Sequence, residues 1–471
     1  MSERGDSPIF AAVLAAGKGT RMKSNRAKVL HTICGVPMVN YAIAALEPIE
    51  TQRTLVVVGH QADEVKSVLP SEVDPILQKE QRGTGDAVRV ALEAIDEEEG
   101  ILLVVNGDGP LISYRTLAGL IQRHRLARVG ATVLVAELVD PTGLGRVMED
   151  AGVVRIVEER DATEAEKEIR LVNLGLYAFE LKEIRRALEL VGAENAQGEL
   201  YLTDALEIIG ETSRAVTFRL KDLEEANLVN DRAQLARAEE ILRRRILDEH
   251  MRRGVTVRDP ASTHIEASVQ IGYDTVILPG TFLRGETRIG SDCVIGPSAD
   301  LLDTVVGNGA LVEHSVGRGA AIGAGAAVGP YAYLRPGTVL GEVSKVGAYC
   351  EVKNARVGAK SKVPHLSYIG DAEIGEEVNL GAGTITANFD GKDKHRTTIE
   401  DGAFTGINTN LIAPITVGEN AYVGAGSVVN KNIPPGKLAV GMPARVIRDA
   451  PEKVSEDGKK DHDGRRAETE G

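Results

Sequence analysis

Aliphatic residues recur at every sixth position through much of the second half of the chain. They stand at Ile271, Ile277, Leu283, Ile289, Ile295 and Leu301, resume after a slip at Val316, Ile322, Val328, Leu334, Leu340, Val346 and Val352, and return at Leu411, Val417, Val423 and Val429. Many of them precede a glycine. This period is typical of a parallel β-helix, because each short strand points one aliphatic side chain inward and glycine lets the chain turn the corner. We therefore expect stacked triangular coils of left-handed form, an exception to the usual right-handed crossover, from about Val269 to Val429.

The first half of the chain alternates short apolar runs with helical stretches. Ile9 to Ala15, Leu55 to Val58 and Ile101 to Val105 each have the length and character of a buried strand. Such alternation predicts an α/β domain with a doubly wound parallel sheet, whose ligands bind at the carboxyl ends of the strands.

A segment rich in Ala, Leu, Arg and Glu joins the two halves, and its apolar residues follow a helical spacing from Asn230 to Arg253. We expect it to form a rigid helical arm. The predicted domains are residues 1–232 for the α/β domain, 233–253 for the helical linker and 254–448 for the β-helix. Residues 449–471 are charged and polar, and we expect them to be a disordered tail.

Composition narrows the possible partners. The 471 residues carry a formal charge of −14 without a basic stripe, which disfavours binding to nucleic acid or to anionic membranes. No apolar run approaches the ~20 residues of a membrane span, and the amino terminus lacks the pattern of a secretory signal, so we expect a cytoplasmic protein. Cys34, Cys293 and Cys350 are widely separated, which predicts single buried thiols rather than disulfides or a zinc site.

The first apolar run leads into a small-residue turn followed by basic residues, in the string LAAGKGTRM. Glycines at 17 and 19 allow backbone N–H groups to approach phosphate oxygens, and Arg21 and Lys28 supply positive charge. Met22 replaces the third glycine of a dinucleotide fingerprint, and no Walker Lys-Ser/Thr pair follows. The turn is therefore predicted to bind phosphates without being a dinucleotide or P-loop motif.

Asp108 follows the apolar run that ends at Val105, in the sequence ILLVVNGDGPL. A carboxylate at the end of a strand is well placed to bind a hard cation, and Mg²⁺ is typically held by one or two protein oxygens together with substrate phosphates. We take Asp108 as a candidate Mg²⁺ ligand.

One segment interrupts the six-residue period, from Ala387 to Thr398, with the sequence ANFDGKDKHRTT. Because it carries glycine, aspartate and four basic residues, it is predicted to leave the coil as a loop, and loops on a regular scaffold commonly carry function.

Several phrases resemble one known enzyme family over most of the chain. LAAGKGTRM and AKVLH are similar to the signature of sugar-phosphate nucleotidylyltransferases, and LQKEQRGTGDA, DPTGLGRV, IVEERDA, VNLGLY and ANLVNDRAQL continue the likeness. LRPG, VKNARVG, VPHLSYIGDAEIG and NLGAGTITANFDG resemble an acetyltransferase half. Together they resemble the bifunctional N-acetylglucosamine-1-phosphate uridylyltransferase/glucosamine-1-phosphate acetyltransferases. The resemblance implies acetyl transfer from acetyl-CoA to glucosamine 1-phosphate, then uridylyl transfer from UTP, in a Mg²⁺-dependent homotrimer.

The resemblance also implies site residues in the first domain, with Arg21 and Lys28 as catalytic groups and Asp108 and Asn230 as the Mg²⁺ ligands. The residues implied to contact UTP or the UDP-sugar are Leu14, Ala15, Ala16, Gly17, Lys28, Gln78, Gly83, Thr84, Asp108, Gly145, Glu158, Asn173 and Asn230.

In the β-helix the resemblance implies that His365 accepts the proton of the attacking amine, a role that a neutral imidazole suits near pH 7. Arg335, Lys353, Tyr368 and Asn379 would bind glucosamine 1-phosphate. The implied acetyl-CoA contacts are Ala382, Asn388, Phe389 and Ala425, with Ile407, Met442 and Arg445 as further candidates. Cys350 is disfavoured as a covalent nucleophile because its sequence neighbours supply no positive charge.

The sequence departs from the family pattern at a few of these positions. Ala27, Asn106 and Leu174 differ in the first domain, and Phe389, Ile407 and Met442 differ in the second. Ile407 removes a hydroxyl that would contact the acyl donor, and Arg445 is a substitute for a missing cation near Met442. Three alternatives therefore stay open: a uridylyltransferase whose β-helix only trimerises, a related nucleotidylyltransferase for another sugar or base, and a non-enzymatic scaffold.

Overall fold

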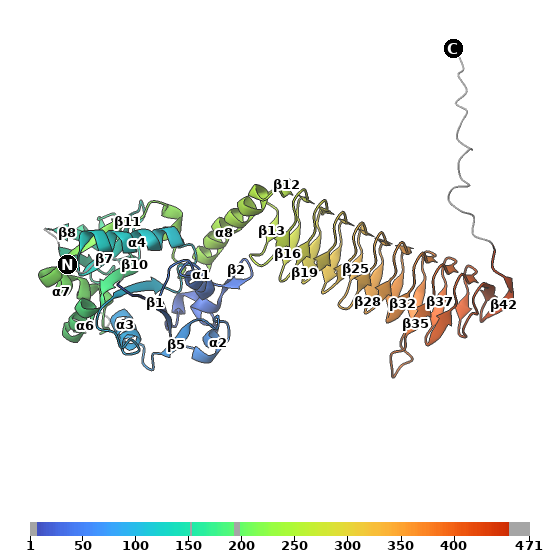
Figure 1. The fold of residues 1–471 in the computed structure, drawn as a ribbon, viewed down its shortest axis with the longest axis horizontal. Helices are drawn as coiled ribbons and strands as arrows, with labels where there is room; N and C mark the ends of the chain where they lie inside the picture. The colour runs from blue at the N-terminus through green and yellow to red at the C-terminus, as the bar shows by residue number, and fades with distance from the viewer. Residues whose placement is uncertain (1–6, 151–152, 193–197, 452–471) are drawn as a thin grey trace, which may run out of the picture. The chain divides into compact units, whose positions relative to one another are not determined.

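The structure is a computed structural model that describes residues 7–150, 153–192 and 198–451. It divides into two compact units, Met1–Arg245 and Ile246–Gly471 (Figure 1). The tail expected to be disordered lies outside the described residues from position 452 onward.

Unit 1 is built on one twisted sheet in the order β11-β7-β10-β6-β1-β4-β5, in which β8 pairs with β10 and β9 pairs with β8. Its strands are β1 (Ile9–Ala15), β4 (Arg53–Val58), β5 (Asp74–Leu77), β6 (Ile101–Asn106), β7 (Ala131–Glu137), β8 (Arg146–Asp150), β9 (Val153–Val157), β10 (Leu171–Glu180) and β11 (Ala215–Arg219), beside a small ribbon of β2 (Thr32–Ile33) and β3 (Val36–Pro37). The three expected strands are confirmed as β1, β4 and β6.

The sheet differs from a fully parallel one at β10 and at the β8–β9 ribbon. β1 runs parallel to β4 and β6, and β11 runs parallel to β7, whereas β10 is antiparallel to both β6 and β7. The antiparallel β8–β9 ribbon, rather than a long crossover helix, connects β7 to β10, so β10 returns in the opposite direction.

Helices cover both faces of this sheet, and β1 shows why both faces are apolar. Ala11 and Val13 belong to one buried cluster, while Phe10 and Ala12 belong to the other. The helices are α1 (Met38–Ala44), α2 (Ala62–Lys66), α3 (Thr84–Leu92), α4 (Tyr114–Ala127), α5 (Glu164–Lys167), α6 (Leu181–Leu190) and α7 (Leu202–Ser213), with 3₁₀ turns η1 (Thr20–Met22), η2 (Lys28–Leu30) and η3 (Leu223–Ala226). Helix α8 (Arg232–Arg252) follows them and continues into unit 2.

Unit 2 is a stack of short parallel strands on three faces, consistent with a left-handed hexapeptide β-helix (Figure 1). Face one holds β12 (Thr256–Val257), β15 (Val276–Ile277), β18 (Val294–Ile295), β21 (Leu311–Val312), β24 (Ala327–Val328), β27 (Lys345–Ala348), β30 (Lys362–His365), β33 (Asn379–Leu380), β36 (Phe404–Thr405), β39 (Tyr422–Val423), β41 (Lys437–Gly441) and β42 (Ala444–Asp449), the last running antiparallel to β41.

The other two faces complete each coil. Face two holds β13 (His264–Ile265), β16 (Phe282–Arg284), β19 (Asp300–Leu302), β22 (Val316–Arg318), β25 (Tyr333–Leu334), β28 (Glu351–Lys353), β31 (Tyr368–Gly370), β34 (Ile385–Ala387), β37 (Asn410–Ile412) and β40 (Val428–Val429). Face three holds β14 (Gln270–Ile271), β17 (Arg288–Ile289), β20 (Val305–Val306), β23 (Ala321–Ile322), β26 (Val339–Leu340), β29 (Arg356–Val357), β32 (Ala372–Ile374), β35 (Thr397–Ile399) and β38 (Ile415–Val417).

The repeating aliphatic residues form the core of the stack, with Ile277, Leu283 and Ile295 fully buried. The expected phase is wrong at one position. Gly317, not Val316, pairs with Leu301 and occupies the inward site. Coils in this part of the stack are one or two residues shorter than three hexapeptides, because Val306 follows its partner Ile289 by 17 residues and Gly317 follows its partner Leu301 by 16. The step from Gly317 to the next inward residue of the predicted series, Ile322, is therefore five residues instead of six.

Cys34, Cys293 and Cys350 are buried free thiols, as predicted. Among the helices of the described residues, none has the length and apolar character needed to cross a membrane.

Candidate active sites

A cavity of about 660 Å³ opens at the carboxyl ends of β1 and β6 in unit 1. Its lining includes most of the residues expected to contact a nucleotide, namely Leu14, Ala15, Ala16, Gly17, Lys28, Gln78, Gly83, Thr84 and Asp108. The strands place them there because β1 and β6 are parallel neighbours that end at the same edge of the sheet.

The turn after β1 has the open backbone that phosphate binding requires. Gly19 has φ of 60°, and a Cβ there would lie 2.5 Å from Cβ of Lys28. A Cβ on Gly17 would meet no atom within 4 Å, so this part of the turn faces open space. The glycine at 19 is therefore required for backbone shape and for the approach of Lys28.

Side chains from three distant segments converge beside this turn. The Lys28 ammonium pairs with the Asp108 carboxylate and donates to Oδ1 of Asn230 at 3.0 Å. Arg21 donates to the same Asn230 oxygen at 2.9 Å. Lys28 and Asp108 are largely buried, with 14% and 19% of their side chains exposed. The cations of Arg21 and Lys28 thus lie beside the side-chain oxygens of Asp108 and Asn230, the two residues that the sequence resemblance implied as metal ligands.

The same oxygens suit a magnesium ion. The Lys28 ammonium is a cation that already contacts both Asp108 and Asn230, so the two oxygens converge on one cation position. Within the described residues no group of three or more His, Cys, Asp or Glu side chains is arranged to hold a metal. Two protein oxygens completed by substrate phosphates is the arrangement that Mg²⁺ commonly adopts.

A second, smaller cavity of about 170 Å³ shares Leu14, Thr84 and Asn106 with the first. It is lined by three predicted residues, Gly145, Glu158 and Asn173. Burial raises the pKa of Glu158, and the nearby Asp161 and Asp204 raise it further.

Asn173 is held in place in this smaller cavity. Its Nδ2 donates to the hydroxyl of Tyr177 at 2.7 Å, and its Oδ1 accepts from the backbone of Gly175 at 2.9 Å. Thr203 also lines the cavity, and its hydroxyl is buried without a hydrogen-bond partner within the described residues. The polar lining of the cavity is therefore held in place at Asn173.

In unit 2, predicted acceptor residues gather where face two meets face three. Arg335 and Lys353 follow face two in neighbouring coils, and Arg335 donates to Glu351 at 2.8 Å. The Lys353 ammonium lies 3.7 Å from the carboxylate of Asp371. Asn388 also donates to Asp371, and it is 8% exposed.

Asp371 is the anion that organises this cluster. Burial alone would raise the pKa of Asp371, but hydrogen bonds from Asn354 and Asn388 and the charges of Lys353 and Lys394 outweigh it and lower the pKa. Lys394 lies close enough to Lys353 for the two ammonium groups to interact, and this proximity lowers the pKa of Lys394. With Arg335 nearby, the cluster holds more positive than negative charge and is suited to a phosphate.

His365 belongs to a separate row of residues at the corner between faces one and two, which we call the corner ladder: His365, Ala382, Ile407 and Ala425. Backbone bonds relate the coils, since the carbonyls of His365, Ala382 and Ile407 accept from the amides of Gly383, Asn408 and Gly426 at 3.1, 2.7 and 2.8 Å. Each ladder residue directly precedes a residue of positive φ. The ladder is a straight track of small or exposed side chains leading away from His365.

Both halves of the chain are similar to known transferase families. Residues 11–160 match the MobA-like NTP transferase domain, and residues 396–431 match the bacterial transferase hexapeptide repeats. A bifunctional protein GlmU from Rubrobacter xylanophilus is 78% identical over 465 residues, covering 99% of this chain and 98% of the relative. The chain belongs to the bifunctional GlmU family.

More distant GlmU relatives also align along their whole length. The bifunctional protein GlmU of Brevibacillus brevis is 48% identical over 458 residues, covering 96% of this chain and 99% of the relative. Among solved structures, a putative glucose-1-phosphate thymidylyltransferase from Bacillus anthracis has a TM-score of 0.41 and 19% identity, covering 50% of this chain and 94% of that one.

Some residues that the sequence predicted for substrate binding lie away from the acceptor cluster or on the exposed surface of a single chain. Asn379 lies on face one, in register with Lys362 and Phe404, away from the acceptor cluster on face two. Phe389 and Met442 are 58% and 71% exposed. Arg445 lies on the exposed strand β42. Among the described residues no hydrogen bond or ion pair engages the His365 imidazole.

The structure also places residues at the candidate sites that could not be predicted from the sequence. Lys394 was counted only as one of four basic residues in the loop, and the sequence contains no signal that selects it over Lys392. Asp371 is identified by its contacts, and Thr203 by the burial of its hydroxyl. Burial raises the pKa of the Cys350 thiol, which donates to Val363 O at 3.2 Å, so Cys350 is held as an unreactive thiol.

Proposed function

We propose that this GlmU-family chain makes UDP-N-acetylglucosamine in two transfers, one in each unit. Glucosamine 1-phosphate first receives the acetyl group of acetyl-CoA, and the N-acetylglucosamine 1-phosphate so formed then receives the uridylyl group of UTP. The observation that carries this proposal is the presence of two separate clusters of cationic side chains, each suited to a phosphate. Lys28, Arg21 and Asn230 form the first, and Lys353 and Lys394 belong to the second.

In unit 1 the sugar phosphate oxygen would attack the α-phosphorus of UTP while the bond to the β-phosphate breaks and pyrophosphate leaves. Arg21 and Lys28 stand beside the glycine turn, where they can stabilise charge on the transferring and leaving phosphates. Mg²⁺ bound by Asp108 and Asn230 would supply further charge neutralisation. Glu158 and Asn173 would hold the sugar in the smaller cavity.

In unit 2 the amine of glucosamine 1-phosphate would attack the thioester carbonyl, forming the C–N bond and breaking the C–S bond. His365 would accept the proton lost by nitrogen and return it to the departing sulfur, a positioned acid–base role worth about 10²–10⁴-fold in rate. The corner ladder would be the surface along which acetyl-CoA binds, beginning at His365. Adjacent coils are about 4.8 Å apart, so the ladder extends roughly 14 Å to Ala425, enough for an extended thiol arm.

We also propose that the chain works as a homotrimer. A strip of bulky residues, His314, Tyr331, Tyr349 and Leu366, lies at the same corner and ends beside His365. His314 stacks on Tyr331 with ring centroids 5.5 Å apart, and Tyr331 stacks on Tyr349 at 5.3 Å. Tyr331, Tyr349 and Leu366 are 55%, 62% and 63% exposed. An exposed apolar strip of this kind marks a contact surface.

His314, Tyr331, Tyr349 and Leu366 share one backbone conformation, with φ between 43° and 60°. Residues at other coil corners, such as Asp274, Val343 and Lys360, adopt it too, so it belongs to the corners of the coils and sets the four side chains in one row. A neighbouring copy packed on the strip would also place its own groups beside His365, which lacks side-chain partners in the described part of a single chain.

A coupled assay tests the proposal. Glucosamine 1-phosphate, acetyl-CoA, UTP and Mg²⁺ should give free coenzyme A thiol, pyrophosphate and UDP-N-acetylglucosamine. Thiol release without UTP tests the acetyl step alone. Pyrophosphate release with N-acetylglucosamine 1-phosphate and UTP tests the second step, and dTTP and glucose 1-phosphate should be poor substitutes. Light scattering should give the mass of three chains, and a monomer would contradict the trimer.

A further inference from the structure

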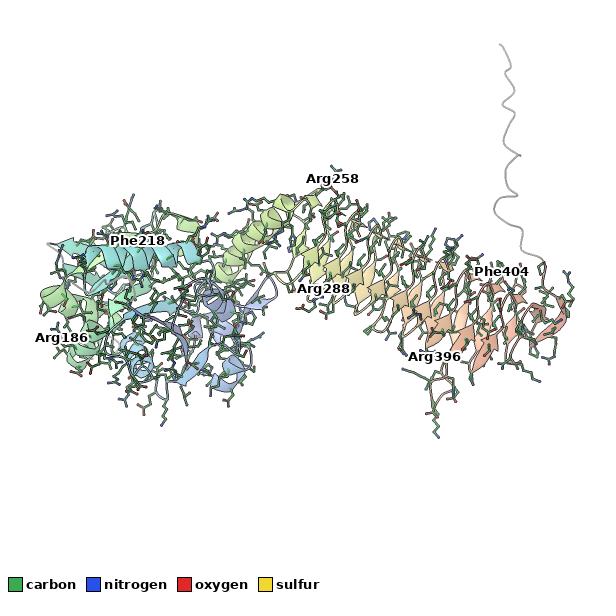
Figure 2. The ribbon with its side chains drawn as sticks, in the orientation of Figure 1. Arg186, Phe218, Arg258, Arg288, Arg396 and Phe404 are labelled. Carbon is green, nitrogen blue, oxygen red and sulfur yellow. The ribbon has the colours of Figure 1, made fainter. Side chains whose placement is uncertain are left out.

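The loop that interrupts the repeat folds into a small hairpin between β34 and β35. Phe389 and Lys394 form an antiparallel bridge, and the amide of His395 donates to the carbonyl of Asn388 at 2.8 Å. Gly391, at the tip, has φ of 99°. The loop leaves the stack beside β35 in Figure 1, and Figure 2 labels Arg396 at its base.

One acidic side chain closes this hairpin. Oδ1 of Asp390 accepts from the amides of Lys392 and Asp393 at 2.8 and 2.7 Å, and its Oδ2 lies 2.7 Å from Nε2 of His395. These bonds, the one from His395 contributing most, lower the pKa of Asp390 far below its usual range. We call the pair the His395–Asp390 clamp.

Both ends of the hairpin carry groups of the acceptor cluster. Asn388 enters the loop and bonds to Asp371, while Lys394 leaves it beside Lys353. Lys394 is directly bonded in sequence to His395, so fixing the imidazole also fixes the backbone that carries the ammonium group.

A hairpin this short gains little from its own backbone bonds. An isolated two-stranded hairpin is marginally stable in water. Holding a lysine ammonium against another cation is also unfavourable unless an anion compensates or the backbone is fixed, because like charges repel. The clamp provides such fixation at the exposed end of the loop, where the stack itself gives no support.

We propose that the His395–Asp390 clamp positions Lys394 to bind the phosphate of glucosamine 1-phosphate, an inference that rests on the acetyl transfer proposed above. His395 is then a positioning residue and not a catalytic one. The other reading is that the clamp merely orders a surface loop, and the two readings differ in the affinity for the acceptor.

The experiment compares His395→Phe, His395→Gln, Lys394→Ala and the double variant His395→Phe/Lys394→Ala in the full-length protein. Glutamine retains an N–H donor near the position of Nε2. Lys392→Ala is the matched control, because it removes the same charge from an exposed site in the same loop. Thiol release gives kcat and the KM values for glucosamine 1-phosphate and acetyl-CoA, and pyrophosphate release from UTP reports on unit 1.

The clamp predicts a KM effect confined to the acceptor. His395→Phe and Lys394→Ala should each raise the KM for glucosamine 1-phosphate about tenfold, the size expected for losing one charge-assisted contact. The KM for acetyl-CoA and pyrophosphate release should stay at parental values, and His395→Gln should remain within about twofold. The double variant should resemble Lys394→Ala alone, because both changes remove one interaction.

An unchanged acceptor KM in His395→Phe would overturn the clamp, and so would additive effects in the double variant. If His395→Phe does not fold, a His395→Gln KM as high as that of Lys394→Ala would overturn it as well. If the parent transfers no acetyl group, the proposed function fails. In that case the affinity for glucosamine 1-phosphate, measured by calorimetry, tests the clamp. The clamp predicts that the double variant His395→Gln/Asp390→Asn binds glucosamine 1-phosphate more weakly than Lys392→Ala does.

Discussion

The two candidate sites differ in how completely one chain builds them. In unit 1, Lys28, Asp108 and Asn230 come from segments up to 202 residues apart and meet directly. In unit 2, the acceptor cluster and the corner ladder lie at opposite edges of face two, and the imidazole of His365 has no side-chain partner among the described residues.

The difference follows from the two architectures. Parallel strands of an open sheet end at one edge, so residues that are distant in sequence converge around a cavity. In a solenoid each coil contacts only its neighbours, so successive coils give rows of residues along a convex surface and no enclosed cavity. A solenoid can add residues to a candidate site through a loop, such as the one that carries Asn388, or through the surface of another copy.

Asp108→Ala should give the largest effect and tests the self-contained site. Losing the carboxylate that pairs with Lys28 and would bind Mg²⁺ should lower pyrophosphate release by about 10³-fold or more. Thiol release by unit 2 should be unchanged. Asp63→Ala, an exposed carboxylate on α2, is the control. Equal loss of both activities in a folded protein would contradict separate sites.

His365→Ala is the matching change in unit 2. Acetyl transfer should fall about 10²–10⁴-fold, since a positioned base is removed, while pyrophosphate release from N-acetylglucosamine 1-phosphate stays at the parental rate. His264→Ala, on face two near the start of the stack, is the control. Full acetyl transfer by the His365 variant would show that another group accepts the proton.

Glu158→Gln tests the smaller cavity and has a distinct pH signature. The raised pKa of Glu158 means that the folded protein holds this proton more tightly than the unfolded chain. Its contribution to stability is present below the unfolded pKa of about 4.3 and is lost as pH rises through the folded pKa. The variant should therefore melt above the parent at pH 8, with the difference shrinking toward pH 4.

The same variant should bind the sugar phosphate less well. The KM for N-acetylglucosamine 1-phosphate should rise up to about tenfold, corresponding to one lost hydrogen bond. Glu164→Gln, an exposed carboxylate on α5, is the control for both measurements. A melting difference that does not change with pH would show that burial of the Glu158 charge is not its cause.

Ile407→Ser should give the smallest effect and tests the corner ladder. Ile407 is 56% exposed and lies between Ala382 and Ala425 in that row. A serine hydroxyl restores one hydrogen bond to the donor, so the KM for acetyl-CoA should fall by about two- to tenfold with kcat unchanged. An unchanged KM for acetyl-CoA would place the donor away from this track.

The sequence predicted the fold well because both halves have strong periodic patterns. The first strand is predicted to its exact ends, Ile9–Ala15, since a glycine turn follows it. The antiparallel direction of β10 was not predictable, because strand direction depends on the β8–β9 ribbon and leaves no mark on the hydrophobic pattern. The shift from Val316 to Gly317 was missed because shortened coils break the count.

The candidate site of unit 1 could be predicted at positions where a sequence motif specifies the residue type. Gly17, Lys28 and Asp108 follow from the turn and the strand end, and they meet in one cavity. Lys394 and Thr203 could not be predicted as site residues from the sequence. A lysine in a basic loop and a threonine in a helix are both common, and neither marks a site. Their importance comes from neighbours distant in sequence, which no local pattern records.

Complementation by mixing tests the central claim of two independent active sites most directly. Asp108→Ala and His365→Ala are assayed alone and as an equimolar mixture, with glucosamine 1-phosphate, acetyl-CoA, UTP and Mg²⁺, and UDP-N-acetylglucosamine is measured. Each variant alone should form almost none, and the mixture should form it readily, because one supplies the acetylated sugar and the other uses it. A mixture as inactive as its parts, with each variant folded, would contradict the account.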